Sequence, residues 1–139
     1  MNSMAIFLPV LLTAAISLSL LILNAYRKNV ARGEGAVDDR AAVDNKAWPL
    51  PVVLTSNALE NQFQFPIVFY VLCFILLELN AVNGLALALA WGFALIRCAH
   101  AFVHVSSNYI PARMATFGLS MIILLVLFIF TFIQVVSAL

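Results

Sequence analysis

Residues 4–26 form an unbroken stretch without a charged side chain. About 20 apolar residues suffice for a helix to cross the roughly 30 Å hydrocarbon core of a bilayer. A cleavable signal peptide carries its basic residues before the apolar stretch, whereas Arg27 and Lys28 follow this one. Residues 4–26 therefore predict a retained membrane span.

Three more apolar stretches follow, at about residues 51–79, 85–105 and 112–136. Only 9% of the chain is charged, against about 25% in soluble domains, so lipid is the expected solvent. The segment between the first two spans, residues 27–49, is polar. We expect residues 1–139 to form a single all-α domain, an integral membrane four-helix bundle with one long loop at 27–49.

The positions of the basic residues predict the orientation. The loop 27–49 holds five of the seven Lys and Arg residues, and Arg113 adds one more on the same side of the membrane. The positive-inside rule places this side in the cytoplasm and both termini on the opposite side. The net charge of +1 and the lack of a basic patch argue against a nucleic-acid partner.

Polar side chains recur at helical spacing within the second and third spans. In the second span they follow i, i+3, i+4, i+7 and comprise Asn57, Glu60, Asn61 and Gln64. In the third they follow i, i+3, i+7 and comprise Arg97, His100 and His104. Each set shares one helix face. Counting outward from the turn near Val82 places Glu60 level with His104 and Gln64 level with His100, so we expect one polar layer.

Two interpretations of this layer are open. Ionisable groups at membrane depth are costly and mark candidate functional sites. Alternatively, Glu, Arg and His side chains in a small bundle satisfy one another and fix the register of the helices. Zinc is a third possibility because the two histidines are one turn apart, but only Glu60 is placed to add a ligand, so we expect no metal.

Arg113 points toward anion chemistry. It lies in the first turn of the fourth helix, where the macrodipole already favours negative charge, so a guanidinium there does not help the helix. It does suit a bound carboxylate, phosphate or thiolate, because a nearby cation lowers the pKa of a thiol from its usual value of about 8.5. Arg97 suits a carboxylate and Glu60 an amine. A zwitterionic peptide that carries a thiol would fit this set.

The spacing of these residues resembles that of the MAPEG family, the membrane-associated proteins in eicosanoid and glutathione metabolism. The resemblance rests on two patterns and extends over essentially the whole chain. One is Asn57-x-x-Glu60-Asn61 followed by Phe65-Pro66; the other is Arg97-x2-His100-x3-His104-x8-Arg113-x3-Phe117. The sequence from Asn61 to Pro66, together with Asn108, resembles that of a bacterial branch of the family. This resemblance implies that the protein resides in a bacterial inner membrane.

The resemblance implies a homotrimer that holds glutathione, as co-substrate, between neighbouring subunits near the cytosolic face. Arg113 matches the arginine that stabilises the thiolate and is the expected catalytic residue. The expected glutathione-binding residues are Asn57, Glu60, Arg97, His100 and His104.

The chain also departs from the glutathione-using members of this family. Those members carry arginines where this chain has Val53 and Ser56, and usually a tyrosine where it has His104. Met114 replaces the serine of the prostaglandin E synthase branch, so that activity is not expected.

The sequence leaves two functions open. The first is a glutathione transferase or peroxidase that takes small lipophilic electrophiles from the bilayer. The second is a non-catalytic or differently catalytic membrane module that binds a lipid or another anionic ligand on the same scaffold. Four spans without an internal repeat argue against a transporter.

Overall fold

The computed structural model describes residues 2–139, and every regular element in this range is a helix. The α-helices are α1 (Phe7–Gly33), α2 (Leu50–Glu60), α3 (Phe65–Glu78), α4 (Gly84–Val105) and α5 (Ile110–Ala138). Single turns of 3-10 helix occur at Ser3–Ile6, Asp39–Ala42 and Asn45–Ala47. Because α2 and α3 together make one span, four units are long and apolar enough to cross a membrane. The prediction of an all-α membrane four-helix bundle is confirmed.

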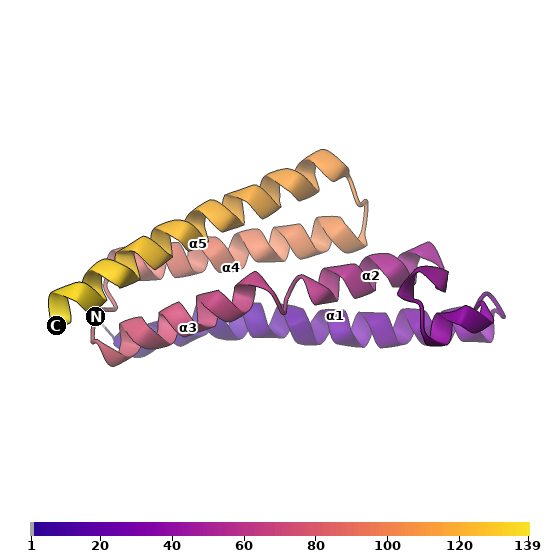
Figure 1. Ribbon diagram of the computed structural model, residues 1–139, viewed down its shortest axis with the longest axis horizontal. Coiled ribbons are helices and arrows are strands. Elements are labelled where there is room, and N and C mark those ends of the chain that lie inside the picture. The colour runs from indigo at the N-terminus through magenta and orange to yellow at the C-terminus, as the bar shows by residue number, and fades with distance from the viewer. Residues whose placement is uncertain (1) are drawn as a thin grey trace.

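The helices run lengthwise along an elongated bundle (Figure 1). Both termini and the turn between α3 and α4 lie at one end, which we call the terminal end. Residues 34–49 and the α4–α5 turn, residues 106–109, lie at the other, which we call the loop end. Every site described below lies in the half of the bundle toward the loop end.

The first helix continues beyond the apolar stretch that predicts it. It runs to Gly33, so Arg27, Lys28 and Arg32 stand on helix rather than in the loop. The side chains of Lys28 and Arg32 lie over the ring of Trp48, at 5.0 and 5.3 Å from its centroid. The indole N–H of Trp48 donates to the carbonyl of Ala41 at 2.9 Å. These contacts fold residues 34–49 back against the last turns of α1.

Arg27 joins three helices at the loop end. Its Nη1 donates to the carbonyl of Pro51 at 3.0 Å and to Oγ1 of Thr55 at 2.6 Å, both in α2. Its Nη2 donates to the carbonyl of Val105, the last residue of α4, at 2.9 Å. That carbonyl has no partner within its own helix, because the last carbonyls of a helix lack one. Arg27 therefore both caps α4 and ties it to α1 and α2.

We predict that Arg27→Ala lowers the free energy of unfolding by about 1.5–3 kcal/mol, the usual range for hydrogen bonds made by a charged group. Chemical unfolding in detergent, followed by circular dichroism, measures the change. Arg40→Ala is the matched control, because the Arg40 side chain is 76% exposed and pairs only with Asp38. Equal stability of the two variants would contradict the prediction.

The second span is not one continuous helix. α2 ends at Glu60 and α3 begins at Phe65, with residues 61–64 as an irregular segment midway along the bundle (Figure 1). Pro66 explains the break, because proline lacks an N–H and its ring collides with the carbonyl four residues earlier. The expectation that Asn57, Glu60, Asn61 and Gln64 share one helix face is therefore wrong beyond Glu60.

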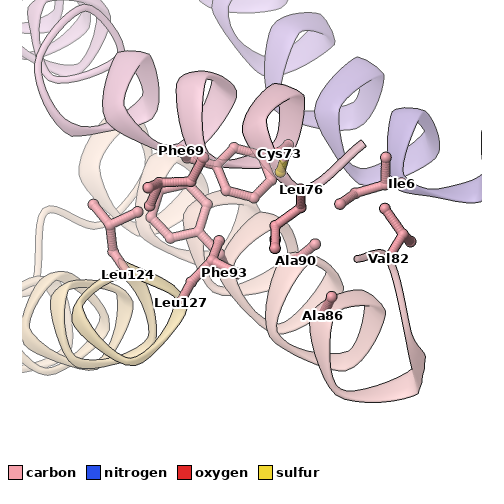
Figure 2. Close-up of a cluster of buried hydrophobic side chains, with 11 residues drawn as sticks. Ile6, Phe69, Cys73, Leu76, Val82, Ala86, Ala90, Phe93, Leu124 and Leu127 are labelled. Atoms are coloured by element: carbon pink, nitrogen blue, oxygen red, sulfur yellow. The ribbon is translucent and has the colours of Figure 1, made fainter. Parts of the chain in front are cut away.

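The apolar core fills the half of the bundle toward the terminal end. It joins nine side chains of α3, α4 and α5 with Ile6 and with Val82 of the α3–α4 turn (Figure 2). Its centre is the stacked pair Phe69 and Phe93, whose ring centroids are 4.5 Å apart and whose side chains are fully buried. Toward the loop end, two smaller apolar clusters lie beside the polar contacts; they comprise Ile16, Leu20, Ala58 and Ala101, and Ala31, Ala41, Trp48 and Val52.

Candidate functional site

The polar stripe of α4 faces the interior of the bundle. Arg97, His100 and His104 are at most 2% exposed, whereas Leu95 and Phe102 on other faces of the helix are 56% and 72% exposed. The i, i+3, i+7 spacing places the three polar side chains on one face. The predicted polar layer is therefore present on α4, and it is buried inside a single subunit.

Arg97 supports the helix break. Its Nη2 donates to the carbonyl of Asn61 at 2.9 Å. A backbone carbonyl freed by a break inside a membrane must be satisfied within the protein, and Arg97 does so. Among residues 2–139 the one ion pair joins Arg40 and Asp38, so no carboxylate neutralises Arg97 or Arg113.

Arg113 is held in place by the turn that precedes its helix. Its Nη1 donates to Oδ1 of Asn108 at 2.8 Å and lies 3.4 Å from Nε2 of His104. Asn108 has a left-handed backbone with φ of 48°, which asparagine tolerates better than most residues. The turn residue that reverses the chain between α4 and α5 thus also orients the guanidinium.

The partners of the two histidines determine which ring nitrogens carry hydrogen. Nδ1 of His100 lies 3.2 Å from the carbonyl of Arg113 and from Oγ1 of Thr116. A carbonyl only accepts, so Nδ1 of His100 donates, and in the neutral ring its Nε2 is an acceptor. Because the Arg113 guanidinium only donates, Nε2 of His104 accepts and its Nδ1 carries the hydrogen. Thr116 supports His100, but nothing in the sequence distinguishes this threonine from others in apolar helices.

A hollow of about 200 Å³ opens beside Arg113; we call it the Arg113 hollow. Its lining consists of Asn61, His100, Arg113, Met114 and Phe117. A guanidinium, an imidazole and an amide meet an apolar wall there, and Phe117 packs edge-on against Phe65 at 5.6 Å. The arrangement suits an anionic group that is attached to an apolar body. The sequence placed Asn61 in the polar layer but did not single it out as a site residue.

Three buried polar side chains lack some of their hydrogen-bond partners in the described part of the chain. Gln62, Arg97 and His104 are at most 2% exposed, and each has side-chain nitrogen or oxygen atoms without a hydrogen-bond partner among residues 2–139. Unsatisfied buried donors cost about 1–3 kcal/mol each. Arg97 and His104 do not line the hollow. Within one subunit they support it, Arg97 through Asn61 and His104 through Arg113.

The two remaining predicted residues lie elsewhere. Asn57 and Glu60 are exposed on α2, and α2 makes no contact with α5, the helix of Arg113, in the described part of the chain. Ser56, which stands where the similar family has an arginine, is buried and donates to Oδ1 of Asn24 at 3.2 Å. The structure thus brings together His100, His104 and Arg113, with Arg97 behind them. It does not bring Asn57 and Glu60 to the same hollow within one subunit.

Comparison with known proteins gives one match. The model of the MAPEG family matches residues 5–133, which is nearly the whole chain. No match was found among curated proteins or among solved structures.

Proposed function

This chain belongs to the MAPEG family, and we propose that it is a membrane glutathione transferase or peroxidase that acts on lipophilic electrophiles. One observation carries the proposal. The Arg113 guanidinium borders an open hollow, is held by Asn108 and His104, and has no carboxylate partner among residues 2–139. A fixed cation without a counter-charge, next to an apolar wall, suits a thiolate that reacts with a lipid-soluble molecule.

The proposed reaction is a displacement or a reduction. The thiol of glutathione gives its proton to solvent, and the Arg113 guanidinium stabilises the thiolate. The sulfur then forms a bond to the electrophilic carbon, and the leaving group departs with the bonding electrons. With a hydroperoxide, two glutathione molecules become the disulfide while the substrate becomes an alcohol and water.

Glutathione binding by all the predicted residues requires more than one subunit. Asn57 and Glu60 face outward on α2, whereas Arg113 lies on α5. In the proposed homotrimer, Asn57 and Glu60 of one subunit complete the Arg113 hollow of the next. Arg97 then acts as a positioning residue through Asn61, and His100 orients the ligand.

The family and four apolar helices make this an integral membrane protein. We further propose that it resides in a bacterial inner membrane with both termini on the non-cytoplasmic side. The orientation is supported by the basic loop end, which holds Arg27, Lys28, Arg32, Arg40, Lys46 and Arg113, whereas the terminal end holds no Lys or Arg. The bacterial membrane rests on the resemblance of residues 61–66 and Asn108 to a bacterial branch of the family.

We predict that millimolar glutathione raises the melting temperature of the protein in detergent, because a ligand that binds only the folded state stabilises it. The rise is expected to disappear in Arg113→Ala and to persist in Arg40→Ala, which removes an arginine remote from the hollow. The S-methyl analogue, which cannot form a thiolate, is expected to shift the melting temperature less. The absence of any shift with glutathione in the parent protein would contradict the proposal.

A second candidate function is a membrane module that binds an anionic ligand without catalysis. The observation in its favour is that Asn57 and Glu60 do not reach the Arg113 hollow in one subunit, which leaves the hollow cationic and free of acidic groups. A fatty acid that raises the melting temperature through Arg113, with no effect of glutathione, would favour this function over the first.

A further inference from the structure

A groove separates α1 and α4 in the half of the bundle toward the loop end. It measures about 350 Å³, and its walls are α1 from Leu12 to Leu23 and α4 from Cys98 to Val105. Small side chains at Ala15 and Ser19 leave it open, since they are too short to fill the space between the two helices. The hydroxyl of Ser19 donates to the carbonyl of Ala15 at 2.8 Å, so the wall presents no free polar donor there.

A polar hollow lies at the loop end of this groove. It measures about 380 Å³ and shares Val105 with the groove. Its polar lining consists of Arg27, Ser106, Ser107 and Asn108, and no acidic residue lines either space. The oxygen of the Asn108 amide already accepts from Arg113, which leaves its N–H groups to donate. The hollow therefore presents one cation and several donors at the level of the membrane surface.

No carboxylate in the described part of the chain forms an ion pair with Arg27. Its three hydrogen bonds go to two carbonyls and one hydroxyl. A guanidinium has five N–H donors, so two remain after these contacts. An anion in the polar hollow would satisfy them and balance the charge.

The α1 wall of the groove is about as long as one leaflet of a bilayer is thick, whereas its α4 wall, from Cys98 to Val105, is about 10 Å long. At 1.5 Å per residue, the helix from Leu12 to Leu23 is about 16 Å long. Half of a hydrocarbon core of about 30 Å is roughly the same distance. A chain that lies in the groove would thus extend from near the bilayer midplane to the surface at which Arg27 stands.

From these observations we propose that the α1–α4 groove and the polar hollow form a binding site for one anionic phospholipid. One acyl chain lies in the groove between Leu12 and Val105. The phosphate lies in the polar hollow, where Arg27, Ser107 and Asn108 donate to it. The site shares no lining residue with the Arg113 hollow, although Asn108 in its lining also accepts a hydrogen bond from Arg113, and the proposal does not depend on the proposed function.

Electron paramagnetic resonance with spin-labelled lipids tests the proposal. The full-length protein is reconstituted in phosphatidylcholine vesicles that contain a trace of phosphatidylglycerol or phosphatidylcholine, each labelled on the acyl chain. We expect the motionally restricted fraction to be at least about twofold larger for phosphatidylglycerol, since the site adds a charge-selective component. Equal fractions for the two lipids would overturn the proposal.

Two pairs of variants assign the effect to the site. Ala15→Trp fills the groove from an exposed position, and Ala88→Trp places the same side chain on an exposed position of α4 outside it. Ser107→Asp adds a negative charge in the polar hollow, and Asn29→Asp adds one on an exposed position of α1 outside it. The first member of each pair is expected to abolish the excess for phosphatidylglycerol, and the second to retain it.

The outcomes separate a lipid from a second copy of the chain as the occupant of the groove. Light scattering in detergent gives the oligomeric mass of each variant. If Ala15→Trp reduces the mass and leaves the lipid selectivity intact, the groove is an interface between subunits and the proposal is wrong. If Ala15→Trp leaves the oligomeric mass unchanged and abolishes the selectivity for phosphatidylglycerol, the lipid proposal is supported. Glutathione-induced stabilisation is expected to be the same in Ala15→Trp as in the parent, so failure here and failure of the proposed function are distinguishable.

Discussion

Arg113→Ala is expected to lower kcat/KM for glutathione conjugation by about 100-fold or more. The reason is that the loss of one fixed hydrogen-bond donor to a negatively charged reacting atom commonly has an effect of this size. The same variant is expected to abolish the thiolate absorbance of bound glutathione at neutral pH. Stopped-flow absorbance on the purified protein in detergent measures both quantities.

Arg113→Lys separates charge from geometry. Lysine retains the positive charge but cannot reproduce the planar contacts of Arg113 with Asn108 and His104, so we expect only partial recovery. Asn108→Ala leaves the guanidinium in the chain but removes its hydrogen-bond acceptor at 2.8 Å, and is expected to affect kcat more than KM. If the Arg113→Ala variant conjugated glutathione at the same rate as the parent protein, the assignment of Arg113 as the catalytic residue would be wrong.

Phe93→Ala is expected to produce the largest loss of stability, about 3–5 kcal/mol in the free energy of unfolding. The side chain is fully buried and stacks on Phe69, with Leu124 and Leu127 of α5 in the same cluster (Figure 2). In lipid the driving force is the loss of packing contacts, because an unfilled cavity forfeits dispersion with every neighbour. Denaturant titration in micelles measures the change.

Phe128→Ala is the matched control. It removes the same side chain from α5 at a position that is 49% exposed. We expect its effect on the free energy of unfolding to stay below about 1 kcal/mol, since surface substitutions rarely exceed a few tenths. If both variants lost a similar amount of unfolding free energy, the buried Phe69–Phe93 cluster would stabilise the bundle no more than an exposed phenylalanine does.

The same sequence patterns predict some residues of the candidate site and miss others. Helical spacing correctly placed Arg97, His100 and His104 on one buried face, because a helix repeats every 3.6 residues. It placed Gln64 with Asn57 on a single face, and the break at residues 61–64 removes that relation. Counting outward from the turn gives only a level for Glu60, that of His104, and not the direction of its side chain; Glu60 is exposed on α2, whereas His104 is buried.

Arg27 shows most clearly what a one-dimensional pattern omits. Its position at the end of an apolar stretch predicts an orientation signal, and the structure adds a role as a link among α1, α2 and α4. The linking partners are two backbone carbonyls and a threonine, which carry no sequence signature of such a contact. The same residue also supplies the charge on which the proposed lipid site depends.

Hydropathy and residue spacing are local properties of the chain, and they were enough to predict an all-α membrane protein of four spans that resembles the MAPEG family. Which polar groups contact one another became known only from the packing of the helices. Arg113 contacts Asn108 and His104 through a left-handed turn, and Arg97 reaches the carbonyl exposed by a broken helix. These contacts depend on the angle and depth at which the helices pack and on the position at which one of them breaks. The periodicity of a single helix predicts none of these properties.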